Sequence, residues 1–305
     1  MEQKSIIIGE GTEFPLKGLI TFPDEVSSPV PAVVMVHGSG PSNMDEKVMK
    51  LTPFRDLAEG LARHGIASIR YDKRTFAYAS KMRKCQVTVK SETIDDAVLA
   101  AELLKSTPEV DSERIFILGH SMGAMLAPRI DSEGADAKGL IMLAGTPYRL
   151  EDIVIRQLNQ AGGKGVLKLI VSLENKVFSK KFDGLYDMSD EEAKRKKFAG
   201  GLNLYYFKEM GKKTAAEYLF ESSKPVLIMQ GGKDFQVLAD DDFAEFRRIL
   251  AGRESTEFRL YPNLNHCFVD AMYSDILKAS KEYGTERHIG EEVISDIADF
   301  IIRNC

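Results

Sequence analysis

The chain has 305 residues, of which 44% are hydrophobic and 29% charged, the balance of an ordinary globular protein. Its 41 Lys and Arg against 46 Asp and Glu give a net charge of −5, which favours neither nucleic acid nor an anionic membrane as a partner. No apolar run reaches the roughly 18 residues of a membrane span, and three widely spaced cysteines disfavour a disulfide framework or a metal site.

The first residues lack the pattern of a secretion signal. Ile6-Ile7-Ile8 is too short for the apolar core of such a signal, and no cleavage pattern follows it. On the condition that Met1 is the native start, we expect a cytoplasmic protein.

The chain opens with strand patterns. Residues 5–22 predict two antiparallel strands joined by a turn at Gly9-Glu10-Gly11. The apolar run 31–36 predicts a strand covered on both faces.

Helices and strands then alternate. A helix is predicted over 53–64, with Gly65 as its stop, and a strand over 66–70. The pattern Thr93-x-x-Asp96 predicts the N-cap of the next helix. A short apolar run at 115–118 predicts another buried strand.

A helical stretch interrupts this alternation in the second half. After a predicted strand at 139–145, residues 148–222 are mostly helical in pattern and carry charge runs. The alternation resumes with predicted strands and a last helix, at 225–230, 256–260 and 290–303. We therefore expect an α/β core, residues 1–147 and 223–305, with a mostly parallel sheet, helices on both faces and an inserted helical cap, 148–222.

The pentapeptide Gly119-His120-Ser121-Met122-Gly123 follows the strand at 115–118 and precedes an alanine-rich helical pattern. Strand, sharp turn and helix are the context of a G-x-S-x-G nucleophile elbow, whose serine is strained and exposed. The two glycines leave room for a close approach of strand and helix. Ser121 is the predicted nucleophile.

A serine nucleophile needs a base, and the chain has five histidines. We favour His266 because it lies on the loop after the last predicted strand, where it can reach the carboxyl edge of the sheet. His288, just before the last helix, is the rival.

The acid that orients the base should lie between the serine and the histidine. Asp234 follows the strand at 225–230 and two glycines, and is the predicted acid. The run Asp240-Asp241-Asp242 is a rival, although it has the pattern of a helix N-terminus.

Acyl transfer also requires two N–H donors for the oxyanion. One is the backbone N–H of Met122, directly after the nucleophile. We assign the second to Ser39 in the loop His37-Gly38-Ser39-Gly40-Pro41, with Gly40 as the near alternative. A phosphate cradle is the other interpretation of this loop, but the spacing of known phosphate motifs is absent.

Together, the segments 37–41, 119–123, 232–234 and 265–266 resemble those of the α/β-hydrolase superfamily. The resemblance covers roughly residues 5–303. It is strongest to bacterial carboxylesterases related to dienelactone hydrolase and feruloyl (cinnamoyl) esterases, some of which share the HGSGP loop and a segment like 70–74. Dienelactone hydrolases proper use a cysteine nucleophile, whereas this chain has Ser121.

The resemblance implies an α/β-hydrolase fold with an eight-stranded, mostly parallel sheet, a Ser-Asp-His triad and no cofactor. It also implies hydrolysis of short-chain acyl or aryl esters by a serine carboxylesterase. The alternatives are a serine peptidase or acyl-peptide hydrolase, and a non-catalytic binder of a small ligand. The expected partner is a small-molecule ester, and a homodimer stays open.

The charged segment Asp72-Lys73-Arg74 follows a predicted core strand near the expected site. Lys73 or Arg74 could contact a substrate carboxylate, but we favour an ion-pair cluster that ties loops together. Cys267, beside His266, is predicted to be a small buried residue.

Overall fold

The computed structural model describes residues 1–161, 179–198 and 202–305. An eight-stranded sheet forms its centre, in the order β1-β2-β4-β3-β5-β6-β7-β8. Strand β2 runs antiparallel to both of its neighbours, β1 and β4, and all other adjacent strands are parallel. The strands are β1 (Glu2–Ile8), β2 (Leu16–Phe22), β3 (Val30–Val36), β4 (Ala67–Tyr71), β5 (Val110–His120), β6 (Gly139–Leu143), β7 (Val226–Gly231) and β8 (Thr256–Tyr261). This confirms the predicted fold class and every predicted strand.

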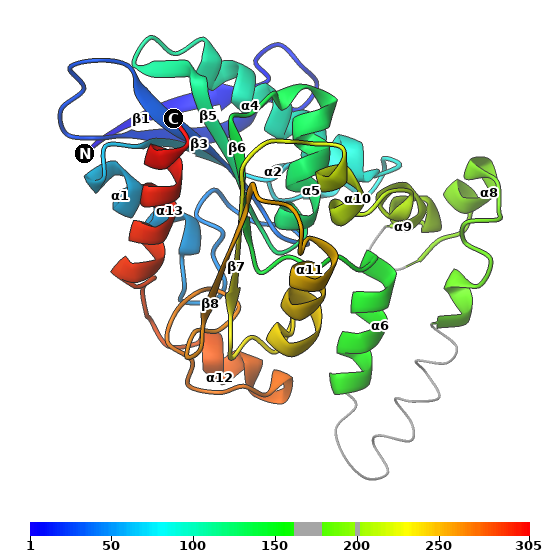
Figure 1. Ribbon diagram of the computed structural model, residues 1–305. Coiled ribbons are helices and arrows are strands. Elements are labelled where there is room, and N and C mark those ends of the chain that lie inside the picture. Colours follow the sequence, from blue (N-terminus) through cyan, green and yellow to red (C-terminus); the bar gives the residue numbers. More distant parts are fainter. Residues whose placement is uncertain (162–178, 199–201) are drawn as a thin grey trace.

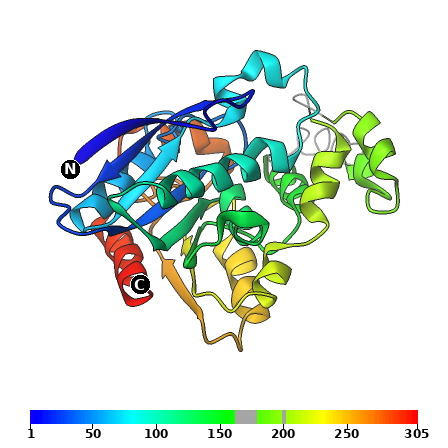
Figure 2. The same cartoon turned by 90° about the horizontal axis from the view of Figure 1, so that it is seen from above.

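Helices cover both faces of the sheet (Figure 1). Those of the α/β core are α1 (Pro53–Arg63), α2 (Arg74–Ala77), α3 (Ala79–Met82), α4 (Asp95–Lys105), α5 (Met122–Ile130), α11 (Ala244–Ile249), α12 (Ala279–Tyr283) and α13 (Glu291–Arg303). Helices α1 and α13 lie together on one face, and α4 and α5 lie on the other (Figures 1 and 2).

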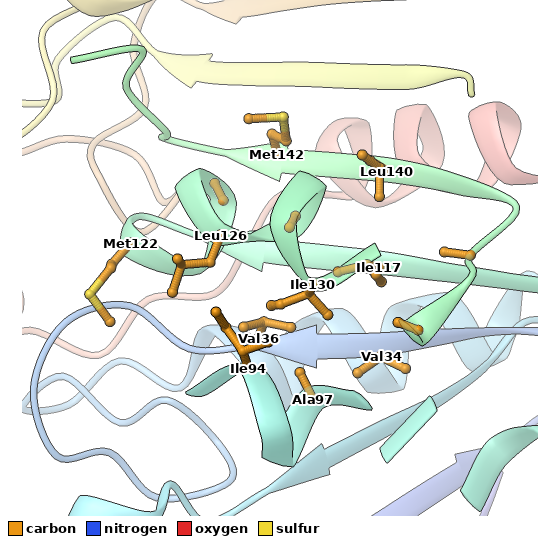
Figure 3. Close-up of a cluster of buried hydrophobic side chains, with 14 of the residues drawn as sticks. Val34, Val36, Ile94, Ala97, Ile117, Met122, Leu126, Ile130, Leu140 and Met142 are labelled. Atoms are coloured by element: carbon orange, nitrogen blue, oxygen red, sulfur yellow. The ribbon is translucent and has the colours of Figure 1, made fainter. Parts of the chain in front are cut away.

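Each face of the sheet has its own apolar core because side chains alternate along a strand. On the face of α4 and α5, Val34 and Val36 of β3 pack near Ile117 of β5 and near Leu126 and Ile130 of α5 (Figure 3). On the opposite face, apolar side chains of α1 and α13 pack against the same strands. Burial on both faces explains why the central strands are continuous apolar runs.

The start of one helix differs from the prediction. Thr93 lies within a helical run that begins near residue 89 as a π-helical turn over Lys90–Ile94 and continues as α4. The N-cap is Thr88, whose Oγ1 accepts the Ser91 N–H at 3.0 Å. The carboxylate of Glu209, far away in sequence, accepts the Val89 N–H at 2.8 Å. The local pattern at Thr93 cannot show this distant acceptor.

A series of helices separates β6 from β7, in the stretch where a cap is predicted. The described part comprises α6 (Leu150–Ala161), α8 (Asp190–Arg195), α9 (Leu204–Gly211) and α10 (Ala215–Phe220), with a short 3-10 turn at Lys180–Phe182. Residues 162–178 and 199–201 of the predicted cap lie outside the described residues. Helices α6, α8 and α9 lie beside the sheet and do not cover either of its faces (Figure 1). No helix among the described residues is long and apolar enough to cross a bilayer.

Candidate active site

Ser121 lies in the sharp turn between β5 and α5, with φ 54° and ψ −117°. A positive φ is strained for a residue with a side chain. A Cβ on Gly119 would lie 2.2 Å from the carbonyl oxygen of Gly123, and a Cβ on Gly123 would lie 2.1 Å from that of Val36. Both glycines are therefore required by close backbone approach, as the motif predicts.

His266 and Asp234 are in contact. The Nδ1 atom of His266 lies 2.6 Å from Oδ2 of Asp234, and both side chains are almost fully buried. A carboxylate only accepts hydrogen bonds, so Nδ1 carries a proton, and in the neutral imidazole Nε2 then keeps its lone pair. This tautomer is the one that a general base requires.

The Asp234 carboxylate is held by four hydrogen bonds. Its Oδ1 accepts the backbone N–H groups of Gln236 at 2.7 Å and Val237 at 3.0 Å. Its Oδ2 accepts Gln230 Nε2 at 3.0 Å in addition to His266. The same carboxylate therefore caps its own loop and contacts the predicted base.

The loop of His266 is fixed by a buried network. Asn265 donates from Nδ2 to Oε1 of Glu282 at 2.6 Å and accepts the N–H of Cys267 at Oδ1. Glu282 also pairs with Arg287 and is fully buried. Cys267 is buried as predicted, and burial together with the nearby carboxylates of Glu46 and Asp234 raises the pKa of its thiol, so the thiol stays protonated.

The rival residues have other partners. His288 is exposed and contacts Asp56 on α1 at 3.1 Å. Asp241 and Asp242 both pair with Arg156 of α6. Neither rival contacts His266 within the described part of the chain.

The two predicted oxyanion donors border one cavity with Ser121 and His266. Met122 begins α5, where N–H groups have no acceptor within the helix. Ser39 follows Gly38, at which an added Cβ would lie 3.2 Å from Cβ of Ser121. The N–H of Ser39 has no acceptor among the described backbone and side-chain hydrogen bonds.

Within the described residues, Ser121 Oγ makes no hydrogen bond to His266. In free enzymes this bond is often long and tightens when substrate binds. The structure therefore brings the predicted acid and the predicted base into direct contact. It also places Ser121 and both predicted oxyanion donors around the same cavity.

The cavity at Ser121 has a volume of about 380 Å³ and receives Leu150, Val154 and Gln157 from α6. A second cavity of about 570 Å³ shares Ser39, Met122, Leu150 and Val154 with the first. Its other walls are mainly apolar, and they include Met82, Val87, Leu202 and Phe207.

Two residues of the segment 72–74, Lys73 and Arg74, form ion pairs, as favoured from the sequence. Arg74 pairs with Asp96 at 2.5 Å, and Lys73 lies 3.4 Å from Glu92. Lys73 is also buried, and its ammonium donates to the carbonyl oxygen of Gly38 at 2.9 Å.

The sequence analysis missed two groups near the site, Gln230 and Glu46. Gln230 ends a predicted strand and carries no motif, although a polar side chain in an apolar run is a signal that could have been followed. Glu46 lies in a loop without a pattern and pairs with His120, for which no partner was predicted.

The family model described as "Serine aminopeptidase, S33" matches residues 27–270. The esterase EstD of Thermotoga maritima is 33% identical over 288 residues, which are 94% of this chain and 66% of that protein. The chain thus spans slightly less than two thirds of the length of this relative.

Solved structures share the fold. Est1E from Butyrivibrio proteoclasticus superposes with a TM-score of 0.58 at 16% identity, covering 98% of both chains. The esterase Pf2001 of Pyrococcus furiosus gives a TM-score of 0.57 at 17% identity, covering 99% of this chain and 91% of its own.

Proposed function

The chain belongs to the α/β-hydrolase family whose model is described as serine aminopeptidase S33, and on that premise we propose that it is a serine carboxylesterase. The observation that carries the proposal is the 2.6 Å contact between His266 Nδ1 and Asp234 Oδ2 at the cavity that also holds the strained Ser121. The name of the relative EstD, an esterase, supports the reaction class.

In the proposed reaction, Ser121 Oγ attacks the ester carbonyl while His266 Nε2 takes its proton. Asp234 holds the imidazole in the required tautomer and stabilises the imidazolium. The N–H groups of Met122 and Ser39 stabilise the oxyanion. The alcohol leaves with the proton from His266, and a water molecule activated by the same base then cleaves the acyl-enzyme.

The two adjoining cavities support esters of short acyl chains or aryl groups as substrates. The site at Ser121, of about 380 Å³, has the size of a small-molecule pocket. The neighbouring apolar cavity, of about 570 Å³, offers space for an aryl or alkyl group on one side of the scissile bond. Because α6 and α9 supply walls of these cavities, we propose that residues 148–222 act as a cap that selects the substrate.

An aminopeptidase is the second candidate, favoured by the description of the family model. Such an enzyme needs a free carboxylate to pair with the substrate ammonium group. The described carboxylates that line the two cavities are Glu46 and Glu92. Glu46 is occupied by Gly38 and His120, and Glu92 by Tyr206 and Lys73, which favours the esterase.

The test uses Ser121→Ala with p-nitrophenyl acetate as substrate. We expect a loss of ~10³-fold or more in kcat, together with loss of labelling by a fluorophosphonate. Near-wild-type turnover by this variant would exclude Ser121 as nucleophile. Faster cleavage of aminoacyl nitroanilides than of nitrophenyl esters would favour the aminopeptidase, and a folded wild-type protein that stays unlabelled would favour a non-catalytic binder.

A further inference from the structure

The Gly38–Ser39 peptide group, which carries the proposed oxyanion donor, is contacted by a buried ammonium. Lys73 Nζ donates to the carbonyl oxygen of Gly38 at 2.9 Å. That carbonyl and the N–H of Ser39 belong to one peptide unit, which is planar and trans, since the described chain has no cis peptide. In a trans unit the two groups point in opposite directions, so an anchor on the carbonyl also sets the direction of the N–H.

The preceding peptide group is held by a buried carboxylate. Oε1 of Glu46 accepts the N–H of Gly38 at 2.7 Å. Gly38 thus donates its N–H to an anion, and its carbonyl oxygen accepts a hydrogen bond from a cation. Both bonds involve a charged group, and such bonds are shorter and stronger than neutral ones.

Each of the two charged side chains has a buried partner. Oε2 of Glu46 lies 2.9 Å from His120 Nδ1, an ion-pair contact with poor N–H alignment. The other nitrogen of His120 lies 2.8 Å from the carbonyl oxygen of His266, which only accepts, so Nε2 carries a proton. Burial opposes the charge of His120, but Glu46 outweighs it and raises the pKa of His120. His120 in turn lowers the pKa of Glu46 against the effect of burial.

The partner of Lys73 connects this cluster to the proposed cap. Glu92 lies 3.4 Å from Lys73 Nζ and accepts the hydroxyl of Tyr206, on α9, at 2.5 Å. Lys73 and Glu92 are both buried, so neither charge is screened by solvent. A buried ion pair of this kind adds little to the free energy of unfolding compared with apolar residues in the same place. What the pair supplies is therefore a fixed geometry for the groups that it contacts.

We infer that Lys73 and Glu46 are positioning residues that orient the Ser39 N–H toward the oxyanion, an inference that rests on the proposed esterase function. Neither side chain has to touch the reacting atoms. Their effect is to keep the Gly38 and Ser39 peptide groups from rotating in a loop whose glycines would otherwise permit it. Gly40, with φ 82°, already shows that this loop uses backbone conformations open to glycine.

The test uses Lys73→Met, which removes the ammonium and keeps the length of the side chain, and Glu46→Gln, which keeps an acceptor for Gly38. Both variants are assayed with p-nitrophenyl acetate and with its thiono analogue, in which sulfur replaces the carbonyl oxygen. Sulfur accepts hydrogen bonds weakly, so the oxyanion donors stabilise the transition state of the thiono ester only slightly.

For Lys73→Met we expect kcat on the acetate to fall by about 10²–10³-fold, the effect of losing one oxyanion donor. KM should change little, and kcat on the thiono ester should fall much less than kcat on the acetate. The ratio of kcat on the acetate to kcat on the thiono ester should therefore decrease toward the value of a site that lacks the donor. Glu46→Gln should shift the ratio in the same direction by a smaller factor. Lys50→Met, at an exposed lysine, is the control and should leave both rates unchanged.

An unchanged ratio in a folded Lys73→Met variant overturns the inference, and so does an equal loss on both substrates, which indicates a structural role. If Lys73→Met does not fold, the ratio measured for Glu46→Gln decides. The proposed function fails separately, through an active Ser121→Ala variant.

Discussion

Asp234→Asn is the most informative single substitution, because the hydrogen bonds around the carboxylate dictate how an amide must sit. Two backbone N–H groups, from Gln236 and Val237, face Oδ1 at 2.7 and 3.0 Å. The amide oxygen of the asparagine has to take that position, since the reverse orientation would direct its NH₂ at two donors. The NH₂ group then occupies the position of Oδ2, facing His266 Nδ1 and Gln230 Nε2.

This arrangement reverses the tautomer of the base. A donor facing Nδ1 requires that nitrogen to accept, so the proton moves to Nε2, which can no longer take the proton of Ser121. We expect kcat on p-nitrophenyl acetate to fall by about 10⁴-fold, the loss typical of this substitution in a Ser-His-Asp triad. That factor corresponds to about 5 kcal/mol in the activation free energy.

Stability should change far less than activity. The variant keeps both backbone hydrogen bonds and loses the bond from Gln230, which costs about 1–2 kcal/mol. Urea denaturation measures this difference, and steady-state kinetics measures kcat and KM. Asp240→Asn, at an exposed aspartate of the following segment, is the matched control and should behave as wild type. A folded Asp234→Asn variant within tenfold of wild-type kcat would refute the assignment of Asp234 as the orienting acid.

Three further predictions concern the framework of the site. Burial and the nearby Lys73 lower the pKa of His37 from 6.5 to about 4, so between these pH values the unfolded chain binds a proton that the folded protein does not, and the free energy of unfolding should fall with decreasing pH across this window by about 3 kcal/mol. His37→Gln should lose most of this pH dependence when urea denaturation is compared at pH 7 and pH 4.5. A variant with the same pH dependence as wild type would contradict the prediction. Gly123→Ala places a Cβ 2.1 Å from the carbonyl oxygen of Val36 and should destabilise the protein by about 3 kcal/mol. The control is Gly252→Ala, where an added Cβ meets nothing within 4 Å and should leave stability unchanged. Equal melting temperatures for the two variants would contradict this prediction. Glu282→Ala leaves Arg287 without its buried partner and should lower the free energy of unfolding by about 3–5 kcal/mol. The control is Glu286→Ala, at an exposed position. A loss below about 1 kcal/mol would show that this network does not hold the His266 loop.

The sequence by itself determined the fold class and singled out Ser121 as the predicted nucleophile. Continuous apolar runs predict strands buried on both faces, and Gly119 and Gly123 flank Ser121 because the backbone there leaves no room for a Cβ. These are local steric requirements, so a short stretch of sequence is sufficient to express them. The order of the strands and the loops that follow them then singled out His266 and Asp234, whose contact the structure contains.

The tertiary structure alone decided which groups hold these residues in place. The first N–H of the helical run near residue 89 donates to Glu209, and the carbonyl of Gly38 accepts from Lys73, 35 positions later in the chain. Glu46 and His120 meet across an even longer separation. No local pattern encodes such pairs, because a buried charge selects its partner by proximity in the folded protein, where the cost of leaving either group unpaired is highest.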